Sequence, residues 1–278
     1  MGFAAALGPA QRAFARRAPG RDACDRARPG PETLERYREI VFQTAEFLAS
    51  YAVYEQVKER YVLGPPVIPA QECHRPETAV NPTLELAYWA FGLETALKWR
   101  RRLGLPPEPR WERVLTKLAQ LPVGDGVYLA HERCPATFTA FNTDHPSMLG
   151  AFGMLPGWGV DRQVMAETLR RVLATWKLET AWGWDFPLIA MTAARLDQPE
   201  RAVEVLLCDS PKNTYLPNGH NRQGTRKDLP LYLPGNGGLL TAVGMMAAGW
   251  EGGPRRHAPG FPQDGSWEVA WEELRPLL

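Results

Sequence analysis

Carboxylate, imidazole and amide side chains gather where a proline-rich loop runs into a helical segment, in the stretch 64–99. Glu72, His74, Glu77 and Asn81 all lie at this junction. A helix needs only one small polar residue at its start, so this density of hydrogen-bonding groups exceeds what helix initiation requires. Taken alone, Glu72 is equally well explained as a carboxylate that interacts with the positive end of a helix dipole. The surplus of polar groups indicates an active site.

Three further loops carry the same mixture of carboxylates, amides, imidazoles and aromatic rings. They span residues 131–148, 178–187 and 212–238. Aromatic rings cover the C–H face of a sugar, while Asp, Asn and His side chains hydrogen-bond its hydroxyls. The loops therefore predict a site for an oligosaccharide or glycoside substrate. The residues expected to bind it are His74, Asp144, His145, Trp182, Trp184, Asn218, His220 and Asn236.

Each of these residues also has a structural explanation when it is taken alone. Asp144 and Asp185 precede short apolar runs, so each is a candidate N-cap. Trp182 and Trp184 are suited to packing between helices. His145 and His220 are each more readily explained as hydrogen-bonded structural histidines than as catalytic bases. The joint occurrence of the set, rather than any single member, favours the sugar site.

Acidic residues in different loops are the groups that glycoside cleavage requires. One carboxyl group protonates the leaving oxygen while a second activates water or attacks the anomeric carbon. A separation of about 6.5–9.5 Å between the two gives inversion, and about 5 Å gives retention. Asp185 and Asp228 are the candidates for the second carboxylate, with Asp144 behind them.

Composition disfavours several other classes of protein. The chain has 278 residues, of which 45% are hydrophobic, so it can bury a sizeable core. Its 32 Lys and Arg against 31 Asp and Glu give no basis for binding nucleic acid or an acidic membrane surface. No apolar run approaches the ~18 residues of a membrane span. The stretch GFAAALG near the N-terminus is too short for a secretory signal, so we expect a cytoplasmic protein.

The sequence predicts neither a metal site nor a cofactor. Cys24, Cys73, Cys134 and Cys208 are far apart and form no Cys-x-x-Cys pair, which argues against zinc and against a dense disulfide framework. The glycine-rich stretch 234–238 lacks the Lys and the Ser or Thr of a Walker motif, so it indicates a tight turn before a helix.

Apolar residues recur at helical spacing along most of the chain. The segments with this pattern, bounded by Pro, Gly or Asp, are 31–55, 82–104, 109–121, 161–179, 185–197, 199–209, 237–250 and 267–278. Extended signals are confined to 61–69 and 126–130. The chain is therefore predicted to be all-α.

Helices joined by short connections form hairpins, and hairpins in series form either a solenoid or a closed toroid. The chain has no repeated consensus at a fixed period, which disfavours a solenoid. Polar and aromatic residues gather at helix starts, where a toroid would bring them to one mouth. We expect an irregular leader at 1–31 and a single (α/α)6 toroid domain of helical hairpins, complete or incomplete, at 32–278.

Four segments occur in the order PAQECH, AVNPTLELAYW, AWGWDFPLIAMTAARLDQPERAVEVLL and LPGNGGLLTAVGMMAAGW. In this order they resemble the catalytic six-hairpin (α/α)6 barrels of glycoside hydrolase family 65 and its relatives, including family 95. Pro69, Glu72, His74 and Asn81 occupy places comparable to those of the family 65 acid loop. The resemblance therefore implies that Glu72 is the general acid. Pro234 stands where family 95 has the Asp of its general base, so the resemblance assigns no base.

The resemblance implies a glycoside hydrolase, or a phosphorylase in which phosphate replaces water. In a phosphorylase, His220 with Lys212 or Arg222 is expected to bind the anion. The alternatives are a non-catalytic sugar-binding or helical scaffold protein, a truncated inactive glycosidase fragment, and a helical-repeat protein that binds peptides. The chain has fewer helical segments than a closed barrel, so we expect it to begin partway round the toroid. Exposed helix faces would then predict a homodimer.

Overall fold

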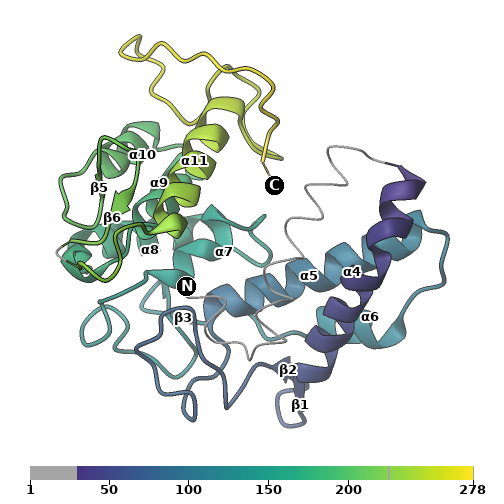
Figure 1. Cartoon of the computed structure of the whole chain (residues 1–278). Coiled ribbons are helices and arrows are strands. Elements are labelled where there is room, and N and C mark those ends of the chain that lie inside the picture. The colour runs from purple at the N-terminus through teal and green to yellow at the C-terminus, as the bar shows by residue number, and fades with distance from the viewer. Residues whose placement is uncertain (1–29, 225, 278) are drawn as a thin grey trace. The chain divides into compact units, whose positions relative to one another are not determined.

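A computed structural model describes residues 30–224 and 226–277, and the described chain is mostly helical (Figure 1). The helices are α4 (Pro31–Tyr51), α5 (Thr83–Arg102), α6 (Pro109–Thr116), α7 (Gly150–Gly153), α8 (Arg162–Thr175), α9 (Asp185–Arg195), α10 (Pro199–Leu206) and α11 (Leu233–Ala248). Two short 3-10 helices, η1 (Ser147–Leu149) and η2 (Leu178–Thr180), accompany them. The predicted all-α character is confirmed.

The strands of the described chain pair only into two-stranded antiparallel sheets. The pairs are β1 (Val53–Glu55) with β2 (Arg60–Val62), β3 (Val123–Gly124) with β4 (Val127–Tyr128), and β5 (Thr214–Tyr215) with β6 (Asn221–Arg222). The predicted extended segments 61–69 and 126–130 overlap β2 and β4. The first 29 residues of the predicted leader lie outside the described residues. None of the described helices combines the length and apolarity needed to cross a membrane.

The chain divides into two compact units. Among the described residues, the first comprises 30–122 with 129–134, and the second comprises 123–128 with 135–224 and 226–277. Compact units of this size can belong to one domain, so the single toroid domain at 32–278 stays a prediction.

In the first unit, α4 packs against α5 through the apolar face that its sequence spacing predicts. The Trp89 indole of α5 donates a hydrogen bond to the carbonyl oxygen of Leu48 on α4, at 3.0 Å. Gly92 allows the close approach, because a Cβ atom at this position would lie 2.5 Å from Cδ1 of Leu48. The pair of helices forms a rigid support for the loop that precedes α5.

The turn 129–134 is anchored to the beginning of α5. The Thr83 backbone N–H donates to the Ala130 carbonyl at 3.2 Å, and the Thr83 hydroxyl donates to the Leu129 carbonyl at 2.5 Å. The Glu132 N–H donates to the Val80 carbonyl at 2.9 Å. These bonds satisfy backbone groups at a helix start that has no side-chain cap.

In the second unit, α9 is the central helix and contacts α10, α11 and α7. Every residue from Asp185 to Arg195 is buried, as expected of a helix that is apolar on nearly all sides. Nη1 of Arg195 donates to the Phe152 and Leu155 carbonyls at 2.8 and 2.7 Å. Because α9 is fixed in this core, the loop that ends at Asp185 is fixed as well.

The predicted helix at 267–278 is wrong. The described residues of this segment are not helical, and Leu277 pairs with the chain that follows α11. Its N–H donates to the Gly249 carbonyl at 2.9 Å, and its carbonyl accepts from the Glu251 N–H at 2.8 Å. The Trp271 ring stacks on His257 with centroids 4.6 Å apart. A short amphipathic segment is a marginal helix on its own, so these tertiary contacts decide its conformation.

Candidate functional site

In the loop 69–81, which we call the Glu72 loop, the exposed carboxylate of Glu72 lies between buried residues. Glu72 is exposed, whereas Ala70 and Gln71 before it and His74 after it are buried. The Ala70 N–H donates to Oε1 of Glu85, on the first turn of α5, at 2.6 Å. The backbone on both sides of Glu72 is therefore held in place.

Two buried histidines, His74 of the Glu72 loop and His131 of the turn 129–134, are in contact. Nε2 of His74 is 3.0 Å from Oε1 of Gln71, and the His74 ring meets the His131 ring edge-on with centroids 4.8 Å apart. Burial, with a contribution from His131, lowers the pKa of His74 to about 4. Burial and the nearby Arg133 charge also lower the pKa of His131. Both imidazoles are neutral at physiological pH.

Glu85 is a buried carboxyl group that was not among the predicted site residues. Its Oε1 accepts from Ala70, but its buried Oε2 has no hydrogen-bond partner. Burial raises the pKa of Glu85 to about 7, despite the opposing effect of the Ala70 N–H. The sequence does not predict the burial of Glu85, because a Glu in the first turn of a helix is usually explained by its interaction with the helix dipole.

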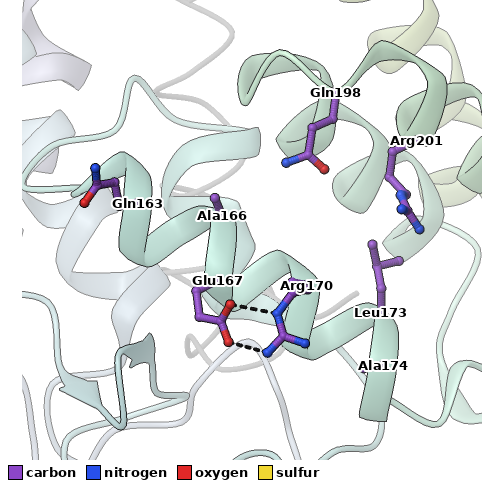
Figure 2. Close-up of a pocket in the computed structure, with 8 residues that line it drawn as sticks. All are labelled: Gln163, Ala166, Glu167, Arg170, Leu173, Ala174, Gln198 and Arg201. Carbon is purple, nitrogen blue, oxygen red and sulfur yellow. Dashed lines mark hydrogen bonds and ion pairs between the residues drawn. The ribbon is translucent and has the colours of Figure 1, made fainter.

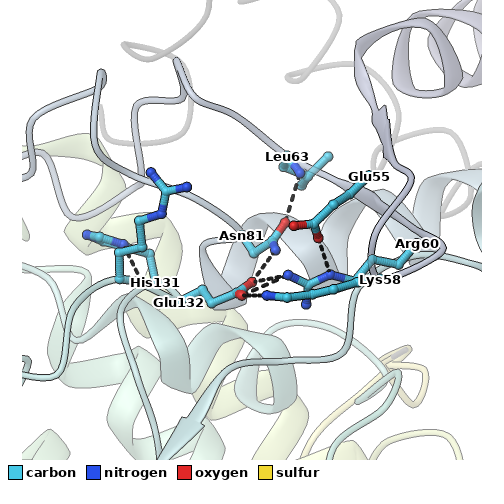
Figure 3. A network of polar contacts seen from close by, with 8 residues as sticks. Glu55, Lys58, Arg60, Leu63, Asn81, His131 and Glu132 are labelled. Atoms are coloured by element: carbon cyan, nitrogen blue, oxygen red, sulfur yellow. Dashed lines mark hydrogen bonds and ion pairs between the residues drawn. The ribbon is translucent and has the colours of Figure 1, made fainter.

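Glu132 anchors the same unit through a charged network (Figure 3). Asn81, in a left-handed conformation with φ of 51°, accepts from the Leu63 N–H at 2.9 Å and donates to Glu132 at 2.5 Å. Arg60 donates to both Glu132 oxygens at 2.7 and 3.0 Å. Burial disfavours the charge on Glu132, but the Arg60 and Asn81 hydrogen bonds prevail and lower its pKa to about 2. Glu132 is therefore a structural carboxylate.

In the second unit, His145 and Asp185 form a buried dyad. Nδ1 of His145 lies 3.0 and 2.9 Å from the two Asp185 oxygens. One of these oxygens also accepts from the Trp182 N–H at 2.7 Å. Burial would lower the pKa of His145, but Asp185 and Asp144 raise it above its ordinary value. The dyad fixes Nδ1 as a donor and turns Nε2 towards Asp144, whose Oδ1 is 3.4 Å away.

Aromatic and cationic side chains surround the dyad. The His145 and Trp184 ring centroids are 4.6 Å apart, and those of Trp182 and Tyr232 are 5.3 Å apart. Nζ of Lys212 lies 4.7 Å above the Trp182 ring. We call this group the indole cluster. Its members are Asp144, His145, Trp182, Trp184, Asp185, Lys212, Arg226 and Tyr232.

The candidates for the second carboxylate differ in their burial and in their hydrogen-bond partners. Asp185 is fully buried and both its oxygens are engaged, which suits positioning of His145 rather than contact with a substrate. Asp228 is exposed and pairs with Arg226, whose guanidinium lies 5.6 Å above the Trp182 ring. The Asp144 side chain is 21% exposed and next to the dyad.

The predicted binding residues Asn218, His220 and Asn236 meet around the β5–β6 hairpin. Asn218 accepts from the His220 N–H at 3.1 Å. Asn236, on α11, accepts from the Asn221 N–H at 3.1 Å and donates to the Gly219 carbonyl at 2.6 Å. These bonds shape the hairpin, which also carries Lys212 at its base.

A groove of about 680 Å³ lies on the outer surface of α8 and α10 (Figure 2). Its charged residues are largely engaged with neighbours, since Glu167 binds Arg170 through two hydrogen bonds and Arg201 pairs with Glu204. Its lining residues include none of the predicted site residues. The groove therefore offers no evident chemistry.

The helices and their hairpin packing define an all-α protein of the helical-hairpin class. A solved structure from the human microbiome, provisionally assigned as a kojibiose phosphorylase, has a similar fold, with a TM-score of 0.55 and 8% sequence identity. The likeness covers 76% of this chain and 33% of the other, so the chain matches about a third of that protein's length. No family model matches the chain, and no curated protein sequence matches it significantly. The likeness supports the predicted six-hairpin fold class.

Proposed function

We propose that the chain is a carbohydrate-active protein that binds an oligosaccharide or glycoside at the indole cluster. The observation that carries the proposal is the His145–Asp185 dyad beside Trp182 and Tyr232. Trp182 and Trp184 are partly exposed, whereas Tyr232 is buried against Trp182. Partly exposed indole rings next to fixed hydrogen-bonding groups are suited to sugars. A protein of similar fold is assigned to kojibiose phosphorolysis, which agrees with this class of ligand.

Within the cluster, His145 and Asp144 are the groups proposed to contact sugar hydroxyls. Asp185 acts through His145, because its oxygens are already engaged. Lys212 and Arg226 lie over the Trp182 ring, so a sugar would displace one of them or lie beside it.

The binding experiment is a titration of intrinsic tryptophan fluorescence with a panel of α- and β-linked disaccharides and aryl glycosides. Loss of one stacking ring costs about 0.5–1.5 kcal/mol, so we expect Trp182→Ala to weaken binding of the best ligand by roughly 2- to 10-fold. Trp267→Ala is the matched control, because Trp267 is 42% exposed and outside the cluster. Equal affinities in the two variants would contradict the proposed site.

We further propose that Glu72 is the general acid of glycoside cleavage. Its exposure on a loop with buried anchors supports this role, because a proton donor must be both accessible and fixed. Within the second unit, Asp144 is better suited than Asp185 to contact a substrate, because its side chain is partly exposed. The wild-type chain should then hydrolyse a glycoside from the panel.

Loss of a general acid costs about 10²- to 10⁴-fold in rate, so Glu72→Gln should lose most turnover while it retains sugar binding. Glu77→Gln is the control, since Glu77 is an exposed carboxylate on the same loop. Equal turnover in the two variants would contradict the role. Binding without turnover in the wild type would favour the alternative of a non-catalytic sugar-binding protein.

Phosphorolysis is a second candidate function. It is favoured by the cationic side chains of Lys212 and Arg226, which lie over the Trp182 ring. Burial and the neighbouring Arg226 charge lower the pKa of Lys212, as expected where like charges converge. Such a pair is suited to a phosphate anion. Lys212→Met should then raise the KM for phosphate at least several-fold with little change in the KM for sugar. Turnover that does not depend on phosphate would exclude this candidate.

A further inference from the structure

His74, His131 and Cys134 form a compact, buried group in the first unit. Their potential metal-ligating atoms all lie within 4.8 Å of one another. The three residues are 5%, 4% and 2% exposed. They come from two segments that are distant in sequence, so the fold itself has brought them together.

Both segments are fixed by neighbouring contacts. The Cys134 N–H donates to the His131 carbonyl at 2.9 Å and closes a His-x-x-Cys turn. The same turn is bonded to the start of α5 through Glu132 and Val80. On the opposite side, His74 is oriented by its bond to the buried amide of Gln71. Metal sites require ligands whose orientation is set by such supporting hydrogen bonds.

The donor set determines the class of metal. Two imidazole nitrogens and one thiolate are the ligands of zinc and related transition metals, whereas calcium and magnesium require oxygen ligands. A zinc ion would draw the ligand atoms closer than the observed spacing, since zinc–ligand bonds are about 2.0–2.3 Å long.

A hydrogen bond of His131 competes with the metal. Nδ1 of His131 accepts a hydrogen bond from the Arg133 N–H at 3.2 Å, which is long. Ligation through Nδ1 replaces this single bond with a coordinate bond. Ligation through Nε2 instead requires the other tautomer and a small rotation of the turn.

We propose that His74, His131 and Cys134 bind a zinc ion that ties the Glu72 loop to the turn 131–134. Among the described residues, no fourth His, Cys, Asp or Glu joins this group, so water completes the coordination. The site is independent of the proposed sugar-binding role. The sequence signal that could have revealed it is the spacing His131-x-x-Cys134, which a search for cysteine pairs overlooks.

The test uses the full chain without a histidine tag. We expect the EDTA-treated protein to take up one Zn²⁺ per chain and to gain several degrees in Tm. With Co²⁺ as the probe, a thiolate-to-metal charge-transfer band should appear in the near ultraviolet. The band should be lost in Cys134→Ser and kept in Cys73→Ser, a matched control because Cys73 is an exposed neighbour of His74. A band that persists in Cys134→Ser would overturn the proposal.

A measurement on the wild type alone guards against a variant that fails to fold. X-ray absorption of the zinc-loaded protein should show two nitrogens at about 2.0–2.1 Å and one sulfur at about 2.3 Å. A first shell of oxygen and nitrogen without sulfur would overturn the site, as would failure to retain zinc after dialysis. Addition of Mg²⁺ or Ca²⁺ should leave the Tm unchanged.

Discussion

At the scale of residues, the engaged carboxyl groups differ in how their charge is supported. Asp185 is fully buried and Glu132 is partly exposed, and hydrogen-bond donors satisfy the charge of both. Glu85 accepts one backbone N–H and keeps an oxygen without a partner. A buried carboxyl group with so little support is stable mainly in its protonated form. Its ionisation should therefore be visible as a loss of stability.

The pH dependence follows from the raised pKa of Glu85, which is about 7 against a reference of 4.5. Below pH 4.5 Glu85 is protonated in both states. Between pH 4.5 and 7 the unfolded chain ionises first, so the folded state is progressively destabilised, by up to about 3 kcal/mol. Tyr51 of α4 is the titratable group known to face it, and its own pKa is raised by burial and by Glu85.

We expect Glu85→Gln to abolish this contribution. Gln keeps a carbonyl acceptor for Ala70 but cannot ionise. Urea denaturation of the variant and the wild type across pH 4.5 to 8 measures the difference. Glu77→Gln is the control, because its side chain is exposed. A difference between Glu85→Gln and wild type that does not change with pH would show that Glu85 has an ordinary pKa.

At the scale of elements, most helices followed from the local apolar pattern, whereas Glu85 and Cys134 did not follow from it. The apolar spacing of 82–104 and 185–197 predicted α5 and α9 within two residues at each end. The segment 267–278 failed because pairing of Leu277 with the chain after α11 outweighs a weak helical preference. Cys134 and Glu85 were missed for a related reason. Their role depends on partners that are distant in sequence, which a local pattern does not reveal.

The α4–α5 contact gives a prediction about helix packing. Gly92→Val should destabilise the protein by about 1–3 kcal/mol, because its side chain would overlap Leu48. Gly244→Ala is the comparison, since a Cβ atom at Gly244 on α11 would meet nothing within 4 Å. That variant should gain about 0.5–1 kcal/mol from helix propensity. Thermal denaturation measures both, and equal stability of the two variants would contradict the packing.

At the scale of the whole molecule, an all-α fold carries the proposed carbohydrate-binding role. The fold rests on the observed helices and on the likeness to a longer protein of which this chain spans about a third. The role rests on the indole cluster, whose predicted members Asp144, His145, Trp182 and Trp184 lie close together. The homodimer expected from an incomplete toroid stays a prediction.

The most direct test is a crystal structure of the protein with the oligosaccharide that binds best in the fluorescence titration. The account predicts a sugar ring against Trp182, with a hydroxyl within hydrogen-bond distance of Asp144 or His145. A sugar bound in the groove of α8 and α10, or at any surface away from Trp182, would contradict it.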